Sequence, residues 1–143
     1  MREDIVQTKQ EKLERLRQAG EEVYPEKTTR SVTNAEALER FDVLRSEEVT
    51  LVGRVRSFRP MGKIAFAHIE DESAKIQIFM HKGTLPEERF ALFVDSVELG
   101  DFVEVRGVLF LTKQGEKTLE VREWHMLSKS IRPIPTEFYG LKE

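Results

Sequence analysis

The feature that most constrains this chain is a change of hydrophobic period at Val49. Before that residue the apolar side chains are sparse, and after it they alternate with polar ones in short runs. A period of two is typical of a β-strand with one buried face, whereas a period near 3.6 is typical of an amphipathic helix. We therefore predict strands over residues 49–58, 64–71 and 75–81, joined by short connections.

The alternation stops after residue 81 and resumes at residue 102. Thr84-Leu-Pro-Glu87 has the form of a capping box and is followed by apolar residues at helical spacing, which predicts a helix ending near Gly100. Residues 102–111 and 118–127 are predicted as two more strands. Three strands, one helix and two strands is the order of an OB-fold, a five-stranded barrel, so we expect an all-β core within an α+β chain.

The two flanks of the predicted barrel have different characters. The first 20 residues have a thin apolar stripe typical of a helix, residues 21–32 are predicted as a loop, and a capping box at Thr33 begins a short helix expected to bury Leu38 and Phe41. The last residues contain Pro133 and Pro135, which resist regular structure. We thus divide the chain into a helical extension (1–48), the barrel (49–127) and a linker (128–143).

Composition excludes several classes of function. The chain has 143 residues, no cysteine, and 23 Lys and Arg against 26 Asp and Glu, so a disulfide scaffold, a thiol nucleophile and a globally basic binder are excluded. The three histidines lack a metal-ligand spacing, and neither a Gly-x-Gly loop nor a Ser-His-Asp pattern appears. We expect no catalytic residues, no metal site and no cofactor. Because no apolar run approaches the ~20 residues of a membrane span, we expect no membrane segment. Because no apolar signal-peptide core follows Met1, we expect a cytoplasmic protein.

The strand alternation predicts one face that could bind nucleic acid. If the aliphatic sets form the core, two aromatic residues remain among polar ones on the outside, and residues 49–81 carry five basic against three acidic groups. Aromatic rings stack on bases, Arg and Lys hold phosphates, and Gln can pair with a base edge. The candidate residues are Phe66, Phe79, His68, Gln77 and Arg59, with Arg54, Arg56 and Lys75 for phosphates. The strand alternation alone is equally consistent with a second interpretation. In it, Phe66 and Phe79 pack between the barrel and the N-terminal helix or a partner.

Several stretches match a known family when taken together. They are Glu11–Gly20 followed by Tyr24-Pro25, Gly53–Arg56, Met61–Phe66, His68–Ser73, Leu109–Glu116 and Leu127–Pro135. These stretches resemble the N-terminal part of class II lysyl-tRNA synthetases over nearly the whole chain. The pattern of the second and third strands is shared with aspartyl and asparaginyl enzymes, so the equivalent domain of those enzymes is an alternative. Ala74 occupies a position where a glycine is common in these enzymes, and this difference affects only a turn.

The resemblance implies an OB-fold that binds the anticodon stem-loop of tRNA-Lys. By motif, Phe66 would stack on the central uridine while Gln77 and Arg59 bond its edge, and Glu116 would face a neighbouring base, with His68 beside it. The family's ATP and lysine motifs lie in a catalytic domain that nothing here matches. The resemblance therefore implies a recognition domain without catalytic residues. Its parent enzyme would contain the catalytic domain, use ATP and magnesium, and be able to form a homodimer.

Two further interpretations remain open at this point. One is a free-standing single-strand-binding OB protein, although an extended Pro-x-Pro tail is of little use to such a protein. The other is a structural domain that contributes dimer contacts, because a helix with so thin an apolar stripe needs a surface to lie against.

Overall fold

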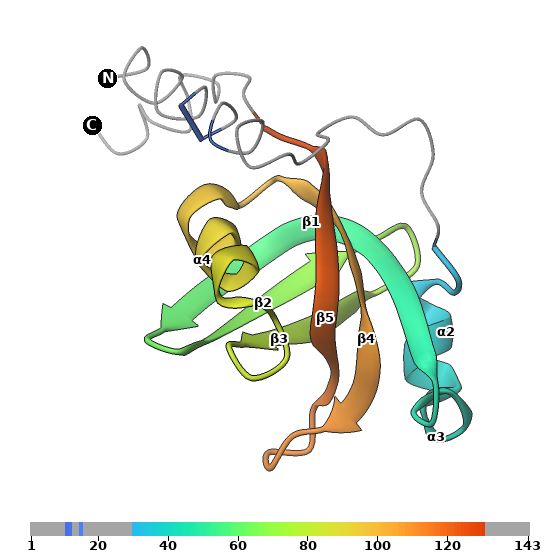
Figure 1. Cartoon of the computed structure of the whole chain (residues 1–143). Coiled ribbons are helices and arrows are strands. Elements are labelled where there is room, and N and C mark those ends of the chain that lie inside the picture. The colour runs from blue at the N-terminus through green and yellow to red at the C-terminus, as the bar shows by residue number, and fades with distance from the viewer. Residues whose placement is uncertain (1–10, 13–14, 16–29, 131–143) are drawn as a thin grey trace.

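The computed structural model describes residues 11–12, 15 and 30–130 of the chain (Figure 1). Five strands close into a barrel in the order β1-β2-β3-β5-β4, and every pairing is antiparallel except the parallel one between β3 and β5. The helix α4 lies between β3 and β4 in the sequence, so the predicted OB-fold is confirmed. The elements are α2 (Asn34–Glu39), α3 (Phe41–Leu44), β1 (Glu48–Met61), β2 (Ile64–Glu70), β3 (Lys75–His81), α4 (Glu87–Ser96), β4 (Phe102–Leu111) and β5 (Lys117–Ser128).

The predicted faces of β2 and β3 are also confirmed. Ala65, Ala67 and Ile69 of β2 are buried in the core, as are Ile76, Ile78 and Met80 of β3. The intervening side chains point outward, because successive residues of a strand alternate between its two faces.

Strand β1 departs from this alternation at one place. Its register with β2 shifts between Val55 and Ser57, which marks a β-bulge. Val55 faces the core, so regular alternation would also turn Ser57 inward. Ser57 is exposed, however, and Phe58 packs partly against the core. The extra residue therefore turns Ser57 outward, a change that a period of two does not predict.

Helix α4 packs against the barrel through Phe90 and Phe93, which are both buried. A reciprocal contact fixes it to β5: the indole N–H of Trp124 donates to the carbonyl of Arg89, and the Arg89 guanidinium donates to the carbonyl of Trp124. The predicted capping box at Thr84 is wrong. The Thr84 hydroxyl instead donates to the Val121 carbonyl at 3.2 Å, and the residue before the helix is Pro86.

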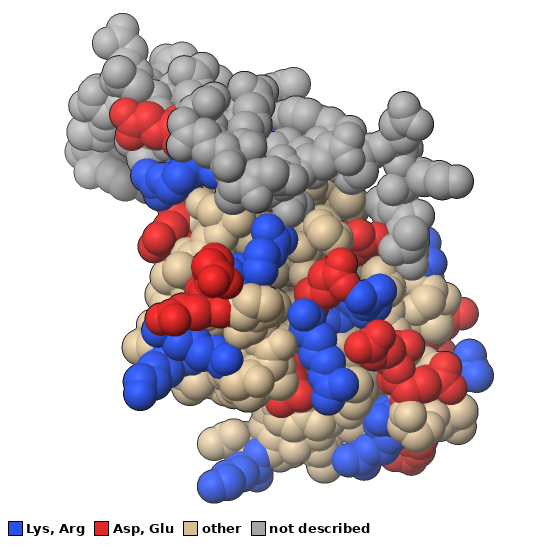
Figure 2. Space-filling view, in the orientation of Figure 1, with Lys and Arg blue, Asp and Glu red and all other residues tan. Residues whose placement is uncertain are grey.

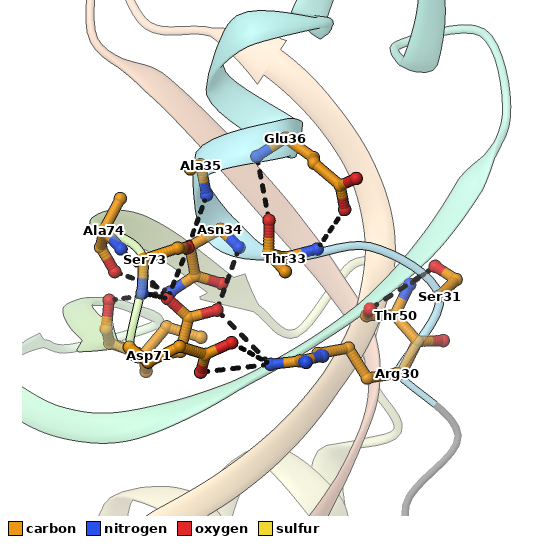
Figure 3. Close-up of polar contacts among 12 residues, drawn as sticks. Arg30, Ser31, Thr33, Asn34, Ala35, Glu36, Thr50, Asp71, Ser73 and Ala74 are labelled. Atoms are coloured by element: carbon orange, nitrogen blue, oxygen red, sulfur yellow. Dashed lines mark hydrogen bonds and ion pairs between the residues drawn. The ribbon is translucent and has the colours of Figure 1, made fainter.

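The capping box at Thr33 is confirmed (Figure 3): the Thr33 hydroxyl accepts from the Glu36 N–H at 3.1 Å, and the Glu36 carboxylate accepts from the Thr33 N–H at 2.8 Å. Of the two residues expected in the core, Phe41 is buried but Leu38 is only partly so. Ala37 is buried instead, because it points from the same helix toward the barrel.

The turn between β2 and β3 holds α2 in place (Figure 3). The Asp71 carboxylate, 1% exposed, accepts from the backbone N–H groups of Asn34, Ser73 and Ala74, and Arg30 lies 3.6 Å away. Burial alone would raise the pKa of Asp71, but these hydrogen bonds outweigh it and hold that pKa below its usual value. The Asp71 carboxylate, together with the Ser73 hydroxyl and the Ala74 carbonyl, thus ties a helix distant in sequence to the barrel.

Two lysines near the ends of the chain, Lys12 and Lys129, form ion pairs with residues that precede β4. Residues 11, 12 and 15 are helical, and Lys12 forms an ion pair with Glu98 at 2.8 Å, whereas the rest of the predicted first helix lies outside the described residues. Lys129 is buried against Asp101 at 2.6 Å, so the first residues of the predicted linker pack on the barrel, and residues 131–143 lie outside the description. None of the helices described is long and apolar enough to cross a bilayer.

Candidate nucleic-acid interface

The outer face of β1, β2 and β3 contains a cavity of about 320 Å³. Register explains why its residues meet: Arg59 of β1 lies opposite Phe66 of β2, and His68 of β2 lies opposite Gln77 of β3. The sequence predicted four of the lining side chains as site residues and missed two. The lining residues are Ser57, Phe58, Arg59, Phe66, His68 and Gln77.

Phe66 forms the aromatic surface of this cavity. Its ring is half-buried and lies 4.9 Å from the ring of Phe79, and the Arg59 guanidinium is 5.8 Å from the Phe66 centroid. Phe79 is supported in turn by Phe110 at 5.9 Å and does not line the cavity. The two aromatics therefore differ: Phe79 supports the ring of Phe66, and Phe66 is the one available to stack on a flat ligand.

Gln77 lines the cavity and is held by a hydrogen bond to β5. It is only 6% exposed, and its amide nitrogen donates to the Thr118 hydroxyl of β5 at 2.9 Å. The Thr118 hydroxyl donates onward to the Glu116 carbonyl. Among the described residues the Gln77 amide oxygen has no hydrogen-bond partner, so it is an acceptor free to pair with a donor on a base edge.

Glu116 reaches this face from the β4–β5 turn. Gly115 adopts φ +88°, a conformation that glycine tolerates, and the Glu116 N–H donates to the Thr112 hydroxyl at 3.0 Å. The turn carries the Glu116 carboxylate to 2.9 Å from the Nε2 of His68. The structure thus brings Glu116 and His68 together, although 48 residues separate them in the sequence.

The phosphate candidates are divided between two places. Arg54 and Arg56 line a second cavity together with three carboxylates, those of Glu70, Asp71 and Glu72. Arg56 is paired with Glu70 at 2.8 Å, and the Arg54 guanidinium donates to the Gly100 carbonyl at 3.0 Å. These two arginines are therefore already bonded and lie apart from Phe66.

Two basic candidates remain without such partners. Lys75 is exposed at the start of β3 and has no hydrogen bond or ion pair within the described part of the chain, and Arg59 contacts only the Phe66 ring there. On the face shown in Figure 2, Lys and Arg are interleaved with Asp and Glu. Local positive charge near the cavity thus comes from Arg59 and Lys75.

Among the described residues, no group of three or more His, Asp or Glu side chains is placed to hold a metal ion. His81 and His125 are half-buried and bonded to carboxylates: His81 to Glu120 at 3.1 Å and His125 to Glu123 at 2.9 Å. The hydrogen bond from His125 leads the causes that lower the pKa of Glu123. Neither histidine lines the cavity of Phe66.

A five-stranded barrel with an aromatic ring, a fixed amide and free basic groups on its β1–β3 face defines a class of nucleic-acid-binding domain. Residues 49–127 match the family model of tRNA anticodon domains, described as OB-fold nucleic acid binding domain, and the chain belongs to this family.

Comparison with individual relatives is more specific than the family match. The chain is 37% identical to the lysine–tRNA ligase of Thermotoga maritima over 149 aligned positions, which cover 100% of this chain and 30% of the relative. It is 43% identical to that of Roseiflexus castenholzii and 44% identical to that of Chloroflexus aurantiacus, in each case over 98% of this chain and 29% of the relative. The chain thus matches an anticodon-binding domain of these ligases and spans less than a third of their length.

Proposed function

We propose that this chain recognises the anticodon stem-loop of tRNA-Lys through the cavity of Phe66. The observation that carries the proposal is the combination in one cavity of a supported aromatic ring, a buried amide with a free oxygen, and a guanidinium beside the ring. The family match and the names of the relatives, lysine–tRNA ligases, support the choice of tRNA as ligand.

Each residue has a separate role in this proposal. Phe66 stacks on the central uridine of the anticodon, and the amide oxygen of Gln77 accepts from the N3–H of that base. Arg59 bonds the same base or its phosphate. Glu116 faces a neighbouring base, with His68 between it and the cavity.

Phosphates are bound mainly by Lys75, since this side chain is exposed and unpaired among the described residues. Arg54 and Arg56 contribute only if they exchange their protein partners for phosphate. This ranking of the three basic residues follows from their present contacts.

We further propose that the chain works as part of a lysine–tRNA ligase in the cytoplasm. In that protein a catalytic domain outside this chain would use ATP and magnesium to attach lysine to the tRNA, and the whole enzyme could form a homodimer. The helical extension 1–48, the barrel 49–127 and the linker 128–143 are the proposed divisions. Binding the tRNA is the contribution of this chain.

The direct test is a titration of the chain with two RNA stem-loops at one fixed salt concentration. One carries the anticodon UUU, and the other has cytidine at the central position. We expect tighter binding of the uridine form, because cytidine has an acceptor where uridine offers the N3–H that Gln77 would bind. Equal affinity for both stem-loops would contradict anticodon reading by this face.

A further inference from the structure

Ser57, which neither the strand pattern nor the family resemblance identified, makes a specific contact at the edge of the cavity. Its hydroxyl lies 2.8 Å from the Nδ1 of His68, and the other ring nitrogen, Nε2, lies 2.9 Å from the Glu116 carboxylate. One imidazole thus joins β1 to the β4–β5 turn across β2. We propose that Ser57 is a positioning residue that, through His68, fixes the Glu116 carboxylate for base reading. This inference rests on the proposed function.

The chemistry of the three groups sets the direction of the hydrogen bonds. An ionised carboxylate can only accept, so the Nε2 of His68 must carry the proton that it shares with Glu116. In a neutral imidazole the other nitrogen is then a bare acceptor. While His68 is neutral, the Ser57 hydroxyl therefore donates to Nδ1. Donation runs from Ser57 to His68 to Glu116.

The backbone places each member of this relay. The bulge between Val55 and Ser57 turns the serine to the outer face, directly opposite His68 in the β1–β2 register. Glu116 is held by its own turn through the Thr112 hydroxyl. The side chains of His68 and Glu116 are 30% and 48% exposed, so solvent competes for both and the ring needs a second bond to hold one orientation.

The consequence concerns one oxygen of Glu116. His68 binds Oε2, and no hydrogen bond within the described chain reaches Oε1. A fixed carboxylate oxygen at the cavity edge would accept from a base that offers a ring N–H, such as uracil, and would repel a base that presents an acceptor at the same place. Without Ser57 the ring can turn or change tautomer, and the position of that oxygen is lost.

The first arm of the test is the tautomer of His68 in the free 143-residue chain. Nitrogen-15 NMR distinguishes Nε2–H from Nδ1–H imidazole, and a His68→Gln variant identifies the His68 signals among the three histidines. We expect the Nε2–H form in the native chain, a mixture in Ser57→Ala, and the native form again in Ser57→Thr, which keeps the hydroxyl. An Nδ1–H form in the native chain, or no change in Ser57→Ala, would overturn the relay.

The second arm is base preference, measured on stem-loops that carry UUU or a single cytidine at each anticodon position. We expect Ser57→Ala to reduce the preference for uridine at one position by about threefold to tenfold, the range of one net hydrogen bond. Binding of the cytidine form should change by less than about twofold, and Ser57→Thr should behave like the native chain. Because both residues act through one contact, Ser57→Ala should add nothing to Glu116→Gln.

The two arms separate the two proposals. If the native chain binds no stem-loop, the proposed function fails and the base-reading role of Ser57 fails with it, whatever the tautomer. If the native chain binds with uridine preference but the Ser57→Ala and Glu116→Gln losses simply add, Ser57 does not act through Glu116. That result overturns this inference and leaves the proposed function intact.

Discussion

At the scale of single residues, the side chains in and beside the cavity differ in how deeply they are buried and in how many contacts hold them. Gln77 is almost fully buried and has one bonded and one free polar atom, so it can present only one kind of atom to a ligand. Phe66 is half-buried and supported from one side by Phe79. Arg59 and Lys75 are exposed and free to follow a phosphate. In the proposed function, specificity would therefore depend on Gln77 and Phe66, and affinity on Arg59 and Lys75.

Replacing Phe66 by alanine should separate binding from folding. Since the ring is half-buried, we expect the free energy of unfolding to fall by about 1 kcal/mol, the order of one aromatic pair. RNA binding should weaken by about 1–3 kcal/mol, the value of one stacked base. Phe93→Ala is the matched control, because Phe93 is fully buried and its loss should cost about 3–5 kcal/mol of stability. Denaturant titrations in which both variants lose equal stability would place Phe66 in the core.

Gln77 and Thr118 form a second matched pair. Gln77→Ala removes the free amide oxygen, so the preference for uridine over cytidine at the central position should fall by about tenfold, the upper range of one net hydrogen bond. Thr118→Val leaves the amide oxygen in place but removes the hydroxyl that holds the amide and bonds the Glu116 carbonyl, so its effect on that preference should be smaller. Both variants are compared in titrations with the two stem-loops. An unaltered preference in Gln77→Ala would remove this residue from the site.

At the scale of elements, the same motif has two different outcomes. Thr33-Asn-Ala-Glu36 and Thr84-Leu-Pro-Glu87 both fit a capping box, but only the first forms one. In the second, Pro86 occupies the position before the helix, and the Thr84 hydroxyl finds an acceptor on β5. A neighbouring strand thus competes with the helix end for the same hydroxyl.

The attachment of α2 to the barrel should depend on the charge of Asp71. The pKa of Asp71 is lower in the folded state than its usual value. The ionised Asp71 carboxylate therefore stabilises the fold at pH values above the usual carboxyl range. This stabilisation is lost as the pH falls through the lowered pKa. Asp71→Asn should lower the free energy of unfolding by about 2–3 kcal/mol at neutral pH. The reason is that a buried carboxylate, which accepts from several N–H groups, is replaced by an amide that has its own N–H donors. Unfolding curves measured between neutral and acidic pH provide the check.

Acidification supplies the control for that prediction. The gap in stability between the native chain and Asp71→Asn should narrow toward low pH, since protonation removes the same charge from the native chain. A gap that stays constant at all pH values would show that the Asp71 charge does not hold α2.

At the scale of the whole molecule, binding must be achieved by a chain whose net charge is −3. A negative net charge makes long-range attraction to RNA weak, and on the face shown in Figure 2 the Lys and Arg side chains lie among Asp and Glu. Affinity therefore relies on the few basic groups beside the cavity.

The dependence of binding on salt should be shallow. Each phosphate contact to a single strand contributes about −0.7 to the slope of log K against log salt, so contacts from Arg59 and Lys75 together predict a slope of roughly −1.4. Lys75→Gln should reduce its magnitude by about 0.7. Arg54→Gln should leave the slope unchanged, because that guanidinium is bonded to the Gly100 carbonyl. Stem-loop titrations at four or more salt concentrations measure both slopes, and an effect of Arg54→Gln equal to that of Lys75→Gln would contradict this ranking.

The sequence by itself determined the order of the elements, the faces of β2 and β3, and the placement of Phe66 and Gln77 on the outer face. Those features follow from local periodicity, because the side chains of a regular strand alternate whatever lies around it. Tertiary structure alone decided the outward turn of Ser57, the pairing of His68 with Glu116, the pairing of Arg56 with Glu70, and the burial of Lys129. Each of these depends on a bulge or on the register of segments distant in sequence, and neither leaves a periodic signal in the chain.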